Sequence, residues 1–275
     1  MSDPLLLDLS LHWLAILIYV LATLANTHGL VFSKDRSERL SYRLLAIGLT
    51  VHGLALLYRW WSQGHGPYLV KYEILSSNAW VALVSFLLFS RLYPRTRCAS
   101  LVVFPAAFLL LAIGIFLDPR AKMLPPTLNS VWLVLHVAFY KIALATLIIG
   151  LAFSLFYCLK NRGRAPWLTR LPALPLIDSY AFRFAGFGFT FWAIAMLAGS
   201  IWAFHSWGRF WGWDPVENWS LLTWVLFGIY LHLRRFMRWH GEKASYCFML
   251  CFVVSLLALF LTPVLNSSIH SEYFK

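Results

Sequence analysis

The most regular feature of the chain is a series of long apolar stretches separated by short polar ones. A helix needs about 20 mostly apolar residues to cross the hydrocarbon core of a bilayer. Eight stretches come close to that length. The chain is therefore predicted to be an all-α polytopic membrane protein with about eight transmembrane helices: Leu11–Phe32, Leu40–Trp60, Asn78–Tyr93, Leu101–Leu117, Val131–Leu159, Phe184–Phe204, Trp219–Arg235 and Tyr246–Leu265.

Basic residues gather in every second loop between these stretches, as expected for cytoplasmic loops. The first stretch has an acidic flank, Asp3 and Asp8, unlike a cleavable signal peptide, so we expect it to persist as a span. Both termini, and the segment between the sixth and seventh spans, are then predicted to be external. The four basic loops contain Lys34, Arg36, Arg39 and Arg43; Arg91, Arg95 and Arg97; Lys160, Arg162, Arg164 and Arg170; and Arg234, Arg235, Arg238 and Lys243.

Composition supports a membrane protein and removes several other classes. Hydrophobic residues make up 60% of the chain and charged residues 12%, too few polar side chains to cover a soluble globule. The four basic loops account for most of the net charge of +12, so no nucleic-acid partner is expected. The chain contains neither a C-x-x-C-H motif nor a phosphate-binding G-x-x-x-x-G-K-[ST] loop. A c-type cytochrome and an ATP-driven motor within this chain are therefore excluded.

The 14 tryptophans are not spread evenly, because several gather in residues 205–224. Within this segment Asp214 is predicted to cap a helix, with Pro215 at its first position and Glu217 completing a capping box. An interfacial aromatic belt explains some of the indoles. A platform for a flat aromatic ligand would also use Gly208 and Gly212, which let the backbone approach a ligand closely. From the residues alone these two interpretations have equal weight.

The segment Trp207-Gly-Arg-Phe-Trp-Gly-Trp-Asp-Pro-Val-Glu217, followed by Tyr230-Leu-His-Leu-Arg234, resembles the tryptophan-rich "WWD" signature of haem-handling proteins. It is most similar to the CcsA/ResC family of the system II cytochrome c synthase, and its D-P-x-E form argues against CcmC. The resemblance covers about the C-terminal half of the chain. It implies an N-terminal four-helix membrane region at residues 1–130 and a cytochrome c assembly region at residues 131–275.

Histidines within apolar spans are candidate ligands because an unsatisfied imidazole is costly in lipid, although hydrogen bonding between helices is the usual alternative. Imidazole is also a common axial ligand of haem iron. His136, near the external end of the fifth span, and His270, after the eighth, can both address the external face. The resemblance implies that these two histidines are the axial ligands of a haem bound at the tryptophan-rich segment.

A second haem site within the membrane is implied by the resemblance at His232, near the cytoplasmic end of the seventh span. His52 is the preferred partner of His232, with His28 as the rival. The remaining cofactor-binding candidates are the residues of the segment itself: Trp207, Arg209, Trp211, Trp213, Asp214, Glu217, Trp219 and Trp224. Arg209 is expected either to hold a haem propionate or to neutralise a lipid phosphate.

Several other polar residues are given simpler interpretations. We expect His12, His65, His205 and His240 to be solvent or headgroup residues. Glu73 and Asp118 are interpreted as ordinary solvated residues on external loops. Lys141 is expected to be a buried charge with no partner evident from the sequence.

The resemblance implies that the chain moves haem, expected to be haem b, to the external face for thioether attachment to an apocytochrome c that carries C-x-x-C-H. It would act as part of a holocytochrome c synthase (haem lyase) complex, with a separate ResB-like membrane subunit. The expected location is a bacterial cytoplasmic membrane or a thylakoid-type membrane, in contact with lipid. The alternatives are a HemX-like regulator of tetrapyrrole synthesis and a transporter of another aromatic solute.

Overall fold

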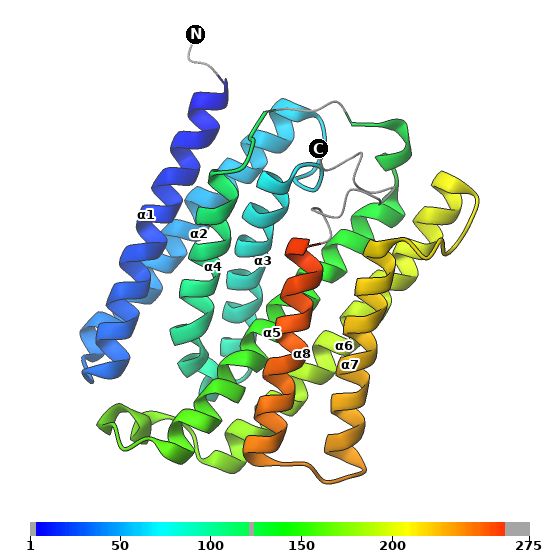
Figure 1. Cartoon of the computed structure of the whole chain (residues 1–275). Coiled ribbons are helices and arrows are strands. Elements are labelled where there is room, and N and C mark those ends of the chain that lie inside the picture. Colours follow the sequence, from blue (N-terminus) through cyan, green and yellow to red (C-terminus); the bar gives the residue numbers. More distant parts are fainter. Residues whose placement is uncertain (1–3, 121–123, 262–275) are drawn as a thin grey trace. The chain divides into compact units, whose positions relative to one another are not determined.

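The structure, a computed structural model, describes residues 4–120 and 124–261 (Figure 1). The described residues form eight α-helices and three short 3-10 helices and contain no strand, which confirms the predicted all-α fold. The helices are α1 (Pro4–Val31), α2 (Asp35–Gln63), α3 (Lys71–Leu92), η1 (Pro94–Ala99), α4 (Ser100–Ile115), η2 (Pro126–Leu128), α5 (Val131–Arg162), η3 (Pro166–Arg170), α6 (Leu174–Trp207), α7 (Pro215–Arg235) and α8 (Gly241–Leu261).

Each predicted span corresponds to one of the eight α-helices. Six of them are long and apolar enough to cross a membrane: the helical stretches Leu5–Val31, Asp35–Gln63, Lys71–Leu92, Pro94–Ile115, Val131–Arg162 and Leu174–Trp207. Charged residues near both ends of α7, among them Glu217 and Arg234, shorten its apolar part. The described part of α8 ends at Leu261. The count of eight spans and the external termini therefore stay predictions.

The chain divides into two compact units. Unit 1 consists of residues 1–123 and 165–171 and contains α1 to α4 with η1 and η3. Its helices α1 and α2 form an antiparallel pair, against which α4 and α3 pack (Figure 1). Gly29 lies so close to the start of α2 that a side chain there would meet the backbone of Glu38 at 2.6 Å. The Arg170 guanidinium donates to the carbonyls of Gly29 and Leu30, which attaches η3 to the end of α1.

Unit 2 consists of residues 124–164 and 172–275, and its described part contains α5 to α8 with η2. The long helices α5 and α6 pack tightly along each other, and a side chain at Gly188 would meet Leu147 at 2.4 Å. Helix α8 packs against α5, α6 and α7 (Figure 1). Gly150 makes room for the ring of Phe248, so this contact also depends on the absence of a side chain.

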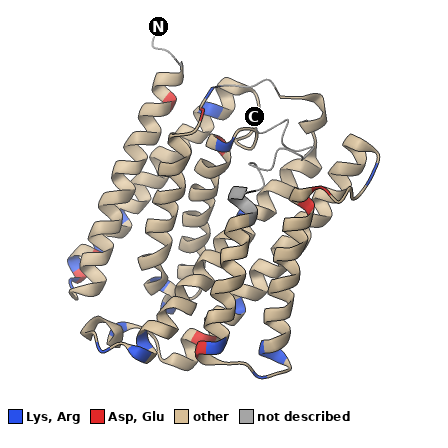
Figure 2. Cartoon of the chain, viewed as in Figure 1, with Lys and Arg blue, Asp and Glu red and all other residues tan. Residues whose placement is uncertain are grey.

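The ends of the helices carry most of the charge (Figure 2). In unit 2, Arg162 at the end of α5 forms an ion pair with Glu242 at the start of α8. Arg234 at the end of α7 binds Asp178 near the start of α6 with a bidentate pair of hydrogen bonds, 2.6 and 2.7 Å long. These four helix ends therefore lie together, opposite the end that carries the tryptophan-rich segment.

Candidate functional site

The tryptophan-rich segment connects α6 to α7 in unit 2. Helix α6 ends at Trp207 and is capped by Gly208, which has φ of 72° and donates its backbone N–H to the Phe204 carbonyl. This left-handed conformation favours glycine, so Gly208 serves to terminate the helix. Gly212 has a different role, because a side chain there would meet the Arg209 guanidinium at 2.8 Å. Arg209 therefore lies over the backbone of Gly212.

The start of α7 has the predicted capping box. Asp214 Oδ1 accepts from the backbone N–H of Val216 at 2.9 Å. Glu217 Oε2 accepts from the backbone N–H of Asp214 at 3.1 Å and from that of Gly212 at 2.8 Å. The two carboxylates thus hold the backbone of the segment, and this is the role that the described contacts give them.

The tryptophans of the segment differ in exposure. Trp213 is 70% exposed and adopts φ of 56°, and Trp211 meets it edge to face at 6.0 Å between ring centroids. The indole N–H of Trp211 is buried without an acceptor among the described residues. Trp207 and Trp219 are half-buried, so each keeps part of its indole accessible. The segment thus contains several partly or largely accessible indoles and one buried indole N–H without an acceptor among the described residues.

Two other tryptophans are part of the helix packing. Trp202 is buried, donates to the Thr127 carbonyl at 2.8 Å and contacts the edge of Trp207. Trp224 stacks on Phe189 at 4.7 Å between ring centroids and donates to the Phe189 carbonyl. Trp224 therefore holds α7 against α6, and it lies more than two helical turns from the start of α7.

His136, on the second turn of α5, lies between α5 and α6. Its Nδ1 is 2.8 Å from the Ala195 carbonyl, and because a carbonyl only accepts, Nδ1 carries the proton. In the neutral ring the lone pair is then on Nε2, the nitrogen that would bind a metal. A side chain at Gly199 would meet His136 Nδ1 at 2.4 Å, so this glycine makes room for the imidazole. The His136 ring is 6.4 Å from the Trp202 ring, centroid to centroid.

A series of side-chain contacts continues from His136 toward α7. The His136 ring contacts the ring of Tyr140 one turn later, at 4.8 Å between centroids. The Tyr140 hydroxyl is hydrogen-bonded to Ser220 Oγ, which also accepts from the Trp192 indole N–H at 3.0 Å. These contacts join α5, α6 and α7 beside the candidate ligand. Lys141, the next residue on α5, is buried as expected.

The histidines predicted for a second site occupy different environments. His232 is an exposed residue near the end of α7, where its ring contacts Phe236. His52 is fully buried in unit 1, with Nδ1 hydrogen-bonded to Tyr19 and Nε2 to Ser76. Iron ligation by His52 would require one of these hydrogen bonds to break. His28 is exposed, and its Nδ1 is hydrogen-bonded to Ser37. The pairing of His52 or His28 with His232 stays a prediction.

His270, the second predicted ligand at the tryptophan-rich segment, lies outside the described residues. The parts of the chain that the structure describes contain no group of three or more His, Cys, Asp or Glu side chains that could hold a metal ion.

Three interpretations of single residues were wrong. His12 and His65 are buried, not solvent or headgroup residues. Glu73 is buried and paired with Arg59, because α3 begins at Lys71, seven residues before the predicted span. Polar residues interrupt the apolar stretch there without ending the helix, so a search for apolar stretches placed the helix start too late.

Two polar clusters were missed in the sequence. One is the Asp178–Arg234 pair of unit 2, to which the Gly241 backbone N–H also donates. The other is a buried group in unit 1 centred on Asp8, His12 and Arg59. The spacing of Asp8 and His12, and of His52 and Arg59, places each pair on one helix face, which is a signal that could have revealed the second cluster.

Comparison with known proteins gives consistent results. The profile of the family described as "Cytochrome C assembly protein" matches residues 46–270. The chain is 34% identical to the cytochrome c biogenesis protein CcsA of Chlamydomonas reinhardtii, over 80% of this chain and 65% of that protein. It is 28% identical to the CcsA of Guillardia theta, over 88% and 89% of the two chains. For the CcsA of Prochlorococcus marinus (strain MIT 9301) the identity is 29%, over 94% and 92%.

A solved structure shares the fold. The chain superposes on a cytochrome c haem lyase, CcmF, with a TM-score of 0.70 at 18% sequence identity, covering 99% of this chain and 50% of that one. At this identity the likeness concerns the arrangement of helices alone. The family profile covers most of the chain and includes the whole tryptophan-rich segment, in agreement with the resemblance seen in that segment. The chain therefore belongs to the cytochrome c assembly protein family and, within it, to the CcsA proteins.

Proposed function

We propose that this chain functions in cytochrome c maturation, binding haem at the tryptophan-rich segment and presenting it for covalent attachment to an apocytochrome c. The observation that carries the proposal is the environment of His136. Its Nδ1 donates to the Ala195 carbonyl, which leaves the lone pair on Nε2, and its ring lies near Trp202, which in turn contacts Trp207. A histidine with a fixed tautomer beside two indoles in edge contact suits an axial ligand of haem.

The other proposed contacts follow from the chemistry of haem. His270 supplies the second axial imidazole. The accessible indoles of Trp207, Trp211, Trp213 and Trp219 contact the faces and edges of the porphyrin ring, which is flat and apolar. Arg209, exposed and seated on Gly212, can donate two hydrogen bonds to a propionate. Asp214 and Glu217 act indirectly, by fixing the backbone that carries these side chains.

The attachment reaction itself requires no nucleophile from this chain. Each cysteine S–H of the C-x-x-C-H peptide adds across one vinyl group of haem, forming a C–S bond on one carbon and a C–H bond on the other. What the protein contributes is the position and orientation of the haem beside the peptide. The rigid connection from His136 through Tyr140 and Ser220 to α7 favours such positioning.

A second haem contact is proposed at His232. This residue lies 15 residues after Glu217 on α7, about 22 Å further along the axis at the rise of an α-helix. It therefore cannot reach a haem held at the tryptophan-rich segment. His232 instead suits a haem that enters from the cytoplasmic leaflet before it moves outward.

The finer features of the proposal follow the family resemblance. We propose haem b as the haem, a ResB-like membrane protein as the partner subunit, and a bacterial cytoplasmic or thylakoid-type membrane as the location. The tryptophan-rich segment would face the external side, where the apocytochrome is folded. No nucleic acid is involved.

Covalent haem attachment tests this function directly. The chain is co-expressed with a ResB-like subunit and an apocytochrome c, and the denatured cytochrome is stained for haem. We expect covalent haem with the unaltered chain and its loss with His136→Ala. His240→Ala is the matched control, because His240 is an exposed histidine beside Asp178, at the end of unit 2 opposite the tryptophan-rich segment. No covalent haem from the unaltered chain, as expected of a HemX-like regulator or a transporter, would reject the proposal.

A further inference from the structure

A network of buried polar side chains extends through unit 1, in three helices that are apolar enough to cross a membrane. Polar and ionisable groups in such helices are costly and usually have a function beyond packing. This polar network does not belong to the candidate haem site of unit 2. Its members, each at most 3% exposed, are Asp8, His12 and Tyr19 of α1, His52 and Arg59 of α2, and Tyr72, Glu73 and Ser76 of α3.

One end of this polar network consists of charged side chains. Arg59 donates to Asp8 Oδ2 at 2.8 Å and to Glu73 Oε1 at 2.7 Å, and the Tyr72 hydroxyl donates to Asp8 Oδ2 at 3.1 Å. Two carboxylates therefore face a single guanidinium. When both are ionised the group has one excess negative charge, which attracts a proton. His12 is the nearest group that can carry one, with Nδ1 3.2 Å from Asp8 Oδ1.

The hydrogen bonds that continue from His12 have a single direction. His12 Nδ1 donates to the Asp8 carbonyl at 2.9 Å, so in the neutral ring Nε2 accepts from the Ser76 hydroxyl at 2.9 Å. Ser76 Oγ then accepts from His52 Nε2 at 2.9 Å. His52 Nδ1 in turn accepts from the Tyr19 hydroxyl at 3.1 Å. Each group donates to the next one, from Tyr19 to Asp8.

A proton can move along such a network with every interior group returning to its original charge. A proton reaching the Tyr19 oxygen releases the Tyr19 hydroxyl proton to His52 Nδ1, and His52 Nε2 gives its proton to Ser76. The Ser76 proton passes to His12 Nε2, and the His12 Nδ1 proton passes to Asp8 Oδ1. One proton enters and one reaches Asp8, and each N–H or O–H bond that breaks is matched by one that forms. After one transfer the protons of His12 and His52 are on the opposite ring nitrogens, so the hydrogen bonds must reverse before a second proton follows.

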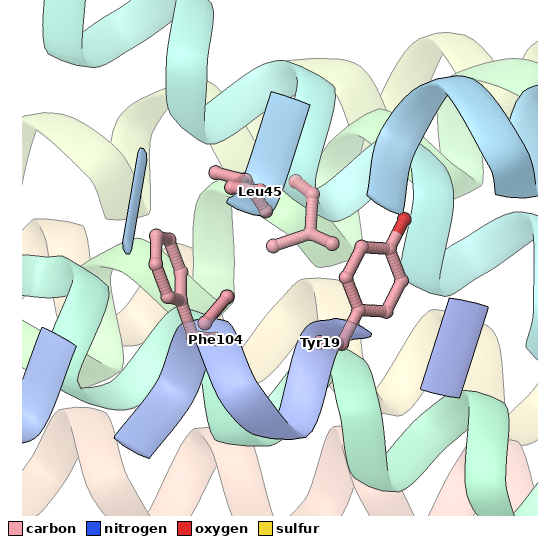
Figure 3. Close-up of a pocket in the computed structure, with 5 residues that line it drawn as sticks. Tyr19, Leu45 and Phe104 are labelled. Atoms are coloured by element: carbon pink, nitrogen blue, oxygen red, sulfur yellow. The ribbon is translucent and has the colours of Figure 1, made fainter. Parts of the chain in front are cut away.

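Polar groups continue beyond Tyr19 toward the other end of unit 1. Between them lies a narrow apolar void that has no room for a water molecule and is lined by Tyr19, Ala22, Leu45, Leu83 and Phe104. Figure 3 shows the Tyr19 ring on one side of this void and Phe104 on the other. Further along, Asn26 donates to Ser41, and Ser41 donates to the Glu38 carbonyl on the first turn of α2.

This second polar group contains an unsatisfied atom. Asn26 Oδ1 is buried without a hydrogen-bond partner among the described residues. Buried polar atoms of this kind usually bind water. The relay and this second group thus lie on either side of one apolar void, which would connect them if it took up water.

Other functions of this polar network have less support. Asp8, His12 and Ser76 are arranged like the acid, base and nucleophile of a hydrolase, but Ser76 is 1% exposed, so no substrate can reach it. Helix α4, which also packs on α1, contains no titratable side chain that could serve as another proton acceptor. The proton-transfer function therefore depends on α1, α2 and α3 alone.

We propose that unit 1 contains a proton path, in which Tyr19, His52, Ser76, His12 and Asp8 form a relay and the apolar void is a gate that opens on hydration. The path needs neither haem nor a partner subunit. It uses both ring nitrogens of His52, so while His52 serves in the relay it cannot pair with His232 at a haem, and His28 would take that role.

Proton flux into liposomes tests this path. The full chain is reconstituted into phosphatidylcholine and phosphatidylglycerol vesicles that contain a pH-sensitive dye, and valinomycin with a potassium gradient sets an inside-negative potential. We expect faster internal acidification than in protein-free vesicles. Ser76→Ala removes the hydroxyl that joins the two imidazoles, and Tyr19→Phe removes the entry hydroxyl but keeps the ring. Both variants should fall to the rate of protein-free vesicles.

Ser90→Ala is the matched control, because Ser90 is a buried serine of α3 whose hydroxyl donates only to the Leu87 carbonyl. It should conduct like the unaltered chain. A thermal unfolding midpoint measured for each variant separates loss of the relay from loss of the fold. The proposal is overturned if the unaltered chain conducts no faster than empty vesicles, or if folded Ser76→Ala and Tyr19→Phe both conduct at the unaltered rate.

Discussion

His136 shows how a single residue of unit 2 is prepared for its proposed function. The Ala195 carbonyl fixes its tautomer, Tyr140 and Trp202 contact its ring, and Gly199 supplies the space that the ring occupies. A ligand held in this way loses little freedom when it binds a metal, and groups of this kind orient histidine ligands in many metal sites. Gly199 contributes only by its lack of a side chain.

Replacing Gly199 should therefore weaken haem binding indirectly, through the position of His136. In Gly199→Ala the new methyl group would lie 2.4 Å from His136 Nδ1, so the imidazole must move and its bond to Ala195 breaks. We expect haem affinity to fall about 10-fold or more, the usual effect of losing a group that orients a ligand. A haem titration of the purified chain measures it.

Gly186→Ala is the control for this change, because Gly186 is on the same helix and a side chain there would meet no atom within 4 Å. It should bind haem like the unaltered chain. Equal affinities for both variants would mean that the packing of His136 does not matter for binding.

At the level of single residues the sequence identified candidates but not their surroundings. His136 could be selected as an unusual histidine in an apolar span, but its acceptor, Ala195, is 59 residues away and is a backbone atom that any residue would provide. His12 and Glu73 were misjudged for a similar reason. Their partners Ser76 and Arg59 come from other helices, so burial depends on packing that the local pattern does not contain.

The element that defines the candidate site is the start of α7. Its cap residues, Asp214 and Glu217, could be recognised in the sequence because a capping box is a local pattern of a few residues. The roles of Gly208 and Gly212 could not be separated in the same way. One ends α6 in a left-handed conformation and the other makes room for Arg209, and both facts require the folded backbone.

The cap of α7 should contribute measurably to stability. In Asp214→Ala the backbone N–H of Val216 loses its acceptor, and we expect the free energy of unfolding to fall by about 1 kcal/mol. Asp214→Ser keeps a side-chain acceptor and should remain close to the unaltered chain. Thermal unfolding in detergent, followed by circular dichroism, compares the two. If Asp214→Ala unfolds at the same temperature as the unaltered chain, the cap does not stabilise α7.

The whole molecule combines two units with different polar interiors. Unit 1 contains the buried relay, whereas unit 2 contains the tryptophan-rich segment at one end and the Asp178–Arg234 pair at the other. The hydrophobic pattern predicted each of the eight α-helices that the described residues form, because a membrane span needs a long apolar stretch whatever its neighbours are. The relay could not be predicted as a unit, since its members come from three helices up to 64 residues apart.

The central claim is that haem binds at the tryptophan-rich segment with His136 as an axial ligand, and the visible absorption spectrum of the purified chain with haem tests it most directly. We predict the spectrum of a haem with two imidazole ligands for the unaltered chain and for His240→Ala, and its loss in His136→Ala. An identical spectrum in His136→Ala and the unaltered chain would contradict the account.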